Sequence, residues 1–330
     1  MNIRNLLWEA AKVGQKKALP ILSFPAAQKL GVSVETLVKS AELQAQAMEI
    51  IANDTATIAA VSLMDLSVEA EAFGATVRFA AEEVPAIVGQ LISDEDDAND
   101  LEVPDLTSGR ALLCVEAVRT AKQRITNKPV LAGMIGPYSL AGRLCDVTEI
   151  MYLCFDEPET VHIVLDKVTK YLIQYGQAMK KAGADGLMMA EPLAGILSPD
   201  MAEEFSMPYV KQIIDALQDD DFAVIYHNCG NSVPQMLDGI YQLGASAYHF
   251  GNAIDLEAVM KVTPADILVM GNVDPANQFA GGNVESITNA TRDLLNKCGM
   301  YSNFIPSSGC DIPAHAKWDN IQAFFAAVEG

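Results

Sequence analysis

The sequence lacks an excess of basic charge, a dense set of cysteines and any run long enough to cross a membrane. Only 22 lysines and arginines oppose 43 aspartates and glutamates, and the net charge of -21 argues against nucleic acid and anionic membrane surfaces as partners. The six cysteines are scattered through 330 residues, which argues against a disulfide scaffold and predicts reduced thiols in the cytoplasm. Residues 1–17 also lack the continuous apolar region of a signal peptide.

Half of the residues are hydrophobic, and strand-like segments alternate with helical sequence along the chain. The eight principal segments lie near residues 19, 58, 130, 185, 223, 246, 267 and 302. Alternation of this kind predicts parallel βαβ units, and eight of them favour a closed (β/α)8 TIM barrel over an open doubly wound sheet. A helix within residues 1–18 would form an N-terminal helical extension. No linker or repeat divides the chain, so residues 1–330 are expected to form a single α/β domain.

Local patterns add detail to this arrangement. Apolar residues at helical spacing predict helices over residues 108–127, 157–182, 199–217 and 318–328. Residues 75–79 read as an extra strand outside the regular alternation. The acidic run over residues 93–100 is interpreted as a solvated loop, since like charges of this density favour exposure to water.

The most informative stretch is the apolar run that begins at Phe222 and ends at His227, Asn228 and Cys229. Residues two apart on a strand share a face, so His227 and Cys229 should project together where the strand ends. Cys310 follows another strand-like segment. One imidazole and two thiolates suit zinc, and three protein ligands leave a fourth position open, as catalytic sites do. On spacing alone, a metal site and an incidental grouping both stay open.

Polar residues interrupt the chain at the expected carboxyl ends of the strands. In a TIM barrel these ends form the face that carries the active site, so one mouth could collect these side chains. They are Asp65, Glu69, Glu191, His227, Cys229, His249, Asn252, Asn272, Asp274 and Cys310.

Five motifs give the chain a resemblance to a known family. They are residues 136–141 (GPYSLA), 190–192 (AEP), 227–230 (HNCG), 271–275 (GNVDP) and 308–313 (SGCDIP). Together they resemble the uroporphyrinogen decarboxylase superfamily and, within it, the methylcobalamin:coenzyme M methyltransferase branch. The resemblance implies a barrel that holds one zinc through His227, Cys229 and Cys310. It also implies transfer of a methyl group from methylcobalamin, a corrinoid presented by a partner protein, to a small thiol.

The resemblance suggests catalytic roles for four further residues. Glu191 is the first choice for a fourth zinc ligand or for the base that takes the proton of the thiol, and His249 is the rival. A buried, hydrogen-bonded histidine is the simpler reading of His249. Asp65 and Glu69 match an Asp-x-x-x-Glu-Ala-Glu pattern of the branch and could face the corrinoid, or could cap a helix.

Four more residues are expected on the cofactor side of the site. Tyr138 and Arg143 follow a Gly-Pro turn and could line it, with packing and a surface ion pair as the alternatives. Asn252 and Asn272 follow the ends of two later strands. The branch would have an acidic residue near position 251, where this chain has Gly251.

Other functions compete with methyl transfer from a corrinoid to coenzyme M. A true uroporphyrinogen decarboxylase needs an arginine-rich cleft for a polycarboxylate substrate, and here only Arg4 precedes Arg78 among seven arginines. A corrinoid carrier would show an Asp-x-His-x-x-Gly signature, which the sequence lacks, so a corrinoid protein must be a partner. A non-enzymatic metal-binding role and transfer to homocysteine or another thiol also stay open.

Overall fold

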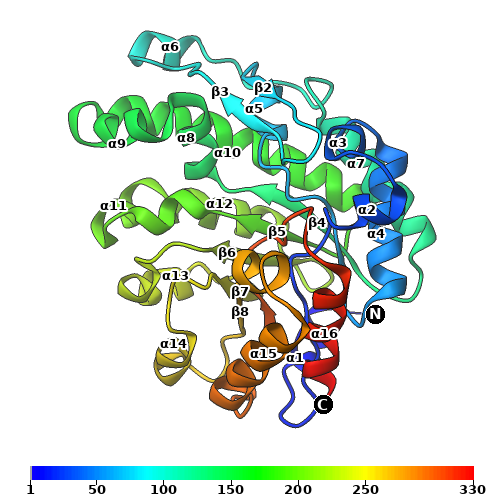
Figure 1. Cartoon of the computed structure of the whole chain (residues 1–330). Coiled ribbons are helices and arrows are strands. Elements are labelled where there is room, and N and C mark those ends of the chain that lie inside the picture. The colour runs from blue at the N-terminus through cyan, green and yellow to red at the C-terminus, as the bar shows by residue number, and fades with distance from the viewer. Residues whose placement is uncertain (1) are drawn as a thin grey trace.

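The computed structural model describes residues 2–330 and confirms the α/β fold, with one parallel sheet that curls around a central axis (Figure 1). Neighbouring strands of this sheet are all parallel. Their order follows the sequence: β1 (Ala60–Val61), β4 (Val130–Ile135), β5 (Gly186–Ala190), β6 (Ala223–Asn228), β7 (Ala247–Phe250), β8 (Val269–Val273) and β9 (Phe304–Ser308).

The segment expected as the first strand, near residue 19, is extended but is not a regular strand. Leu19 N donates to Pro306 O at 3.1 Å, and Ile58 N donates to Ala18 O at 3.1 Å, so the segment lies between β9 and the residues before β1. Because Pro20 and Pro306 have no N–H, a full ladder cannot form here. The barrel therefore closes through seven strands and one irregular segment.

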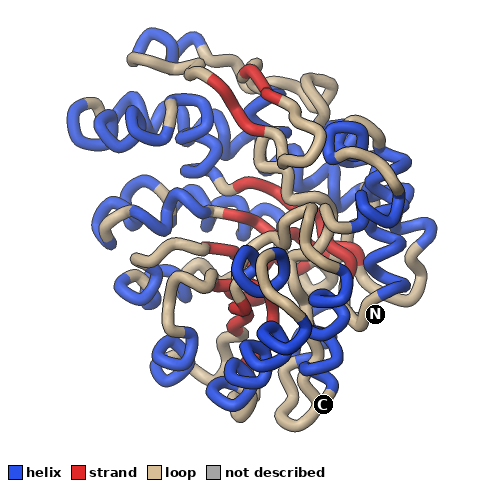
Figure 2. Tube along the Cα trace, in the orientation of Figure 1, coloured by secondary structure: helices blue, strands red, loops and turns tan. Residues whose placement is uncertain are grey.

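Helices follow the strands and cover the outside of the sheet, as Figures 1 and 2 show. The first eight are α1 (Ile3–Ala10), α2 (Ala26–Leu30), α3 (Val34–Val38), α4 (Ala41–Asp54), α5 (Val68–Ala72), α6 (Glu95–Asp100), α7 (Ala111–Arg124) and α8 (Pro137–Cys145). The others are α9 (Val147–Asp156), α10 (Pro158–Lys181), α11 (Pro199–Phe205), α12 (Met207–Leu217), α13 (Leu237–Gln242), α14 (Leu256–Val262), α15 (Val284–Cys298) and α16 (Trp318–Glu329). Within residues 2–330, none of these helices has the length and hydropathy needed to span a membrane.

Three local expectations need revision or detail. The acidic stretch 93–100 is not a loop but contains α6, because Asp94 accepts from Asp97 N at 3.0 Å and the acidic first turn suits the positive end of the helix dipole. The helix expected over 199–217 is divided into α11 and α12 at Ser206, two residues before Pro208. The extra strand is β2 (Thr76–Arg78), which pairs antiparallel with β3 (Ala86–Val88) away from the barrel sheet (Figure 2).

Helix α1, the predicted N-terminal extension, closes the amino-terminal end of the barrel. Its residues Ile3 and Leu7 are fully buried. They belong to the same apolar cluster as Leu131, Met188 and Ile225, which come from three adjacent strands. The helix therefore completes the core at this end and leaves the opposite end as the mouth.

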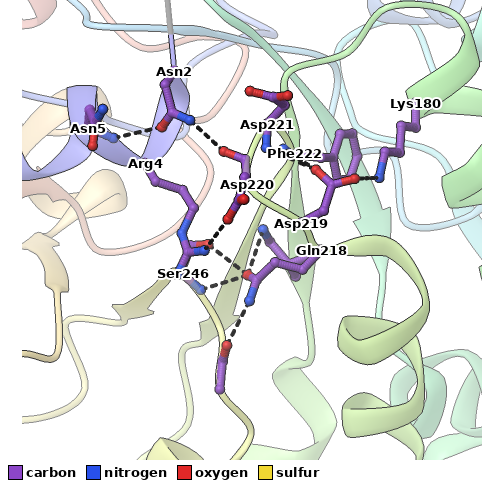
Figure 3. Close-up of polar contacts among 12 residues, drawn as sticks. Asn2, Arg4, Asn5, Lys180, Gln218, Asp219, Asp220, Asp221, Phe222 and Ser246 are labelled. Carbon is purple, nitrogen blue, oxygen red and sulfur yellow. Dashed lines mark hydrogen bonds and ion pairs between the residues drawn. The ribbon is translucent and has the colours of Figure 1, made fainter.

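Polar contacts hold α1 against the turn before β6 (Figure 3). The Asn2 amide donates to Asp220 O at 2.5 Å. In the same turn, the Asp219 carboxylate accepts from two backbone N–H groups at 2.9 Å and from Lys180 Nζ at 2.5 Å. Gln218 bridges to the start of β7 through both atoms of its amide. These groups satisfy one another and fix the entry of the strand that carries His227.

Candidate metal centre

The three residues expected as metal ligands meet at the carboxyl ends of β6 and β9. His227 is the penultimate residue of β6, Cys229 follows that strand, and Cys310 lies two residues beyond β9. One ligand atom from each residue lies within 4.8 Å of the other two. Cys310 Sγ is 3.5 Å from His227 Nε2. Among residues 2–330, no other trio of histidine, cysteine, aspartate or glutamate side chains has this spacing.

Glycines let the surrounding loops pack directly against Cys229. A Cβ at Gly251 would lie 2.5 Å from Cys229 Cα and 2.6 Å from its Cβ. A Cβ at Gly230 would lie 2.2 Å from Gly195 O, so the loops after β5 and β6 touch through their backbones. The structure therefore has no room for an acidic side chain at position 251, where the branch would have one.

The two cysteines shift each other's acidity in opposite directions. Interaction with Cys310, followed by that with His227, holds the pKa of Cys229 well below its ordinary value although burial opposes this. The interaction with Cys229, together with burial, raises the pKa of Cys310. A bound cation would favour the deprotonated form of both thiols.

His249 lies behind His227, on the neighbouring strand β7. Its Nδ1 is 2.8 Å from His227 Nδ1, and its Nε2 is 2.7 Å from Ser307 Oγ. Complete burial lowers the pKa of His249 well below its ordinary value, and its neighbour His227 lowers it further. Both ring nitrogens are thus engaged away from the cysteines, which corresponds to the buried, hydrogen-bonded alternative.

Glu191 directly follows β5, and its backbone N donates to His227 O at 2.8 Å. Its carboxylate is completely buried at the amino end of α8, where it accepts from Tyr138 N at 3.1 Å, Ser139 N at 2.6 Å and Ser139 Oγ at 2.5 Å. Burial raises the pKa of Glu191 to about 7, against the opposing effect of these bonds. The carboxylate contributes no atom to the group formed by His227, Cys229 and Cys310.

Asp65 lies in a buried ion pair. Its Oδ2 is 2.5 Å from an Arg110 guanidinium nitrogen, and its Oδ1 accepts from Ser67 N at 3.1 Å. Arg110 also pairs with Glu71 at 2.6 Å and so ties the loop after β1 to the start of α7. Sequence reasoning missed Arg110. A buried carboxylate such as that of Asp65 needs a cationic partner, but no local sequence pattern identifies an arginine 45 residues away from it.

Glu69 is buried at the carboxyl end of β4. Its Oε1 accepts from Ile135 N at 3.0 Å, whereas its Oε2 is buried without a hydrogen-bond partner among residues 2–330. Burial raises the pKa of Glu69 to about 7, and the hydrogen bonds that its carboxylate accepts partly offset this effect. The side chain therefore holds a proton more readily than an exposed glutamate does.

Tyr138 and Arg143 occupy different environments on α8. The Tyr138 hydroxyl is buried and donates to Met151 Sδ at 3.3 Å, which places its ring in the packing between α8 and α9. Arg143 is half-buried, and burial lowers its pKa. It makes no ion pair within residues 2–330, so the surface ion pair considered for it is absent from the structure that these residues form.

Asn252 and Asn272 lie beside a separate cavity of about 380 Å³ that includes neither His227 nor the two ligand cysteines in its lining. The Asn272 amide donates to Gly251 O at 2.9 Å and to Ile254 O at 3.2 Å. Asn272 thereby holds the loop that packs on Cys229. Asn252 is exposed and lies at the rim of this cavity.

The curled parallel sheet, with polar side chains gathered at the carboxyl ends of its strands, defines a barrel enzyme of the α/β class. The family model for uroporphyrinogen decarboxylase (URO-D) matches residues 17–330, and the chain belongs to this family.

Individual relatives include two kinds of enzyme. The methylcobamide:CoM methyltransferase of Methanosarcina acetivorans is 26% identical over 263 residues, which cover 78% of this chain and 75% of that protein. The uroporphyrinogen decarboxylase of Hydrogenovibrio crunogenus is 26% identical over 286 residues, 82% of this chain and 78% of that protein. A methyltransferase structure from Methanosarcina mazei shares the fold, with a TM-score of 0.88 at 22% identity over 99% of this chain and 98% of that one. The resemblance to the methyltransferase branch is confirmed, and with it the prediction of a methyltransferase enzyme.

Proposed function

We propose that this enzyme transfers a methyl group from a corrinoid, presented by a partner protein, to a small thiol, with a zinc ion held by His227, Cys229 and Cys310. The observation that carries the proposal is the meeting of these three ligand atoms within 4.8 Å at the mouth of the barrel. One imidazole and two thiolates form a ligand set that zinc prefers.

The separation of the ligand atoms supports zinc. In a tetrahedral site with Zn–S near 2.3 Å and Zn–N near 2.1 Å, sulfur and nitrogen lie about 3.6 Å apart. The Cys310 Sγ to His227 Nε2 distance is 3.5 Å. Three protein ligands leave one position for the acceptor, and zinc there would keep an acceptor thiol in the thiolate form that attacks a cobalt-bound methyl group.

The chain must also supply a group that takes the proton of the thiol. We assign this role to Glu191, the carboxyl group at the end of the strand beside His227. A pKa of about 7, raised by burial, suits a group that exchanges a proton at neutral pH. The new bond joins the acceptor sulfur to the methyl carbon, and the electron pair of the broken methyl–cobalt bond stays with cobalt.

Roles on the corrinoid side of the site stay predictions for six residues: Asp65, Glu69, Tyr138, Arg143, Asn252 and Asn272.

Decarboxylation of a porphyrinogen is the alternative that the second kind of relative represents. A polycarboxylate substrate requires several free arginines. Arg110 is already paired with Asp65 and Glu71, and the cysteines at the mouth have no part in a reaction without metal. The cysteine pair therefore favours methyl transfer over decarboxylation.

Metal analysis tests the ligand assignment. Wild-type protein purified under reducing conditions should carry about one zinc per chain, and Cys229→Ala and Cys310→Ala should bind zinc more than about 100-fold more weakly. Cys114→Ala is the matched control, because Cys114 is also a half-buried cysteine but lies in α7. The proposal fails if the wild-type protein holds no zinc and cannot be loaded with it.

A demethylation assay tests the reaction. Loss of the methyl–cobalt absorbance of methylcobalamin is followed with coenzyme M, homocysteine and other thiols as acceptors. Activity with coenzyme M supports the reaction named for the methanogen relative, and activity only with another thiol reassigns the acceptor. Turnover of uroporphyrinogen without any demethylation of methylcobalamin would establish the decarboxylase alternative.

A further inference from the structure

Behind His227, a chain of hydrogen bonds runs through His249 and Ser307 to the irregular segment that closes the barrel. We infer that His249 and Ser307 select the tautomer of His227 that presents a bare Nε2 to the two cysteines. The inference rests on the proposed metal site for its purpose, but it concerns where two protons lie in the protein itself. His249 and Ser307 are then positioning residues.

The chain of hydrogen bonds begins at the backbone oxygen of Leu19, which can only accept a hydrogen bond. Leu19 O is 2.7 Å from Ser307 Oγ, so the single hydroxyl proton of Ser307 is donated to Leu19. Ser307 Oγ can then only accept from its second neighbour, His249 Nε2, at 2.7 Å. His249 must carry a proton on Nε2.

The next step transfers this constraint to His227. A neutral imidazole with a proton on Nε2 has a lone pair on Nδ1. His249 Nδ1 is 2.8 Å from His227 Nδ1, so His227 donates its own Nδ1 proton across this contact. In the neutral ring, the Nε2 atom of His227 is then left without a proton, and this is the atom 3.5 Å from Cys310 Sγ.

Two further observations point to the same assignment. His227 Nδ1 also lies 3.3 Å from the carbonyl oxygen of His249, which can only accept, so a proton on His227 Nδ1 has two acceptors. A doubly protonated His249 would reverse the contact. It would, however, be a fully buried charge with no ion-pair partner among residues 2–330.

The arrangement has a clear use in a metal site. A ligand histidine that donates its other ring N–H is held in one orientation and becomes a better electron donor, and loss of such a partner costs about 10- to 100-fold in metal affinity. Since Leu19 belongs to the irregular closing segment, the seam of the barrel helps to set the chemistry of His227. The absence of a strand near residue 19 thus leaves its carbonyl free for Ser307.

Nuclear magnetic resonance of the metal-free protein tests the inference directly. The chain has four histidines, so their ring nitrogens can be assigned after selective ¹⁵N labelling and comparison with His227→Gln and His249→Gln. The expected result is a proton on Nδ1 of His227 and on Nε2 of His249. In Ser307→Ala the His249 pattern should change, because its acceptor has been removed.

Zinc affinity, measured by competition with a chromophoric chelator, supplies the second readout. Ser307→Ala should bind zinc about 10- to 100-fold more weakly than wild type. Ser308→Ala is the matched control: Ser308 is the next residue of β9, is equally buried, and its hydroxyl accepts from Ile21 N at 3.0 Å without touching His249. It should leave the affinity unchanged.

The possible outcomes separate this inference from the proposed function. A proton on His227 Nε2 in the metal-free protein, an unchanged zinc affinity in Ser307→Ala, or equal losses in Ser307→Ala and Ser308→Ala would overturn it. If wild-type protein binds no zinc at all, the proposed function fails, and the proton positions in the metal-free protein still decide whether His249 and Ser307 set the tautomer.

Discussion

The two ends of the barrel treat buried polar groups in opposite ways. At the amino-terminal end, Lys16 Nζ donates to Ala11 O at 2.5 Å, Tyr301 O at 2.6 Å and Phe304 O at 2.9 Å. At the carboxyl end, Glu69 Oε2 is buried without a partner within residues 2–330, and the thiols of Cys229 and Cys310 face the site. Lys16 is thus fully bonded, whereas the carboxyl end keeps some polar groups without a protein partner.

The difference indicates that the two ends of the barrel have different roles. Buried polar groups that are fully paired add stability and define one arrangement, whereas unpaired ones cost free energy and persist where a ligand or reaction needs them. Stability residues at the amino-terminal face and reactive residues at the carboxyl face are typical of this barrel. Substitutions at the two ends should therefore separate stability from activity.

The largest effect is expected at the carboxyl end, on activity alone. Cys310→Ala should lower the rate of methylcobalamin demethylation by more than about 100-fold, the upper range for residues that only support a metal ligand. The free energy of unfolding of the metal-free protein should change by no more than about 1 kcal/mol, since the thiol is only partly buried. Urea denaturation of the metal-free proteins measures the second quantity. Full activity in this variant would contradict the division.

At the amino-terminal end, the expected effect is on stability and not on the metal site. Lys16→Met leaves three carbonyl oxygens without their common donor and should lower the free energy of unfolding by about 3 kcal/mol, with zinc affinity unchanged. Lys12→Met is the control, because Lys12 makes only an exposed pair with Glu9. A loss of zinc affinity in Lys16→Met would show that the two ends are coupled.

Glu69 should give the carboxyl end a pH dependence between pH 5 and 7, whereas Lys16, whose pKa burial lowers to about 8, titrates at higher pH. Burial raises the pKa of Glu69 to about 7, from about 4.5 in the unfolded chain, so between these pH values the folded chain binds one more proton. The contribution of Glu69 to stability is therefore fully present below about pH 4.5, and it falls by about 2 kcal/mol between pH 5 and pH 7. Glu69→Gln should remove this part of the slope and leave the part contributed by Glu191, whose pKa burial also raises to about 7, as urea denaturation at several pH values would show. An identical slope in both proteins would assign it to another group.

The smallest effect is expected at the amino-terminal surface. Arg4 and Asp220 form an exposed pair at 3.9 Å. Arg4→Ala should change the free energy of unfolding by less than about 0.5 kcal/mol and leave activity intact. A larger loss, seen by thermal or urea denaturation, would mean that α1 depends on this charge and not on the burial of Ile3 and Leu7.

The sequence was most informative where the deciding pattern is local. Two-residue spacing at a strand end predicted that His227 and Cys229 share a face, and strand positions along the chain placed Cys310 at the same mouth. The partners of these residues were not predictable in this way. Ser307, Arg110 and Leu19 act through contacts with residues 45 to 288 positions away, which no spacing encodes.

Errors arose for equally physical reasons. The segment near residue 19 has the apolar composition of a strand, but prolines on both sides of the seam remove the N–H groups that a ladder requires. The charge of the acidic run at 93–100 predicts a loop, whereas the cap supplied by Asp94 allows a helix to form there.

The direct contact of Gly251 with Cys229 has a consequence for engineering and for divergence among relatives. A carboxylate cannot be introduced at position 251 by a point substitution, because the new Cβ would overlap Cys229. The loop after β6 would have to shift at the same time. A fourth protein ligand at position 251 would thus require a second substitution that moves this loop. Either substitution alone would disturb the packing around Cys229.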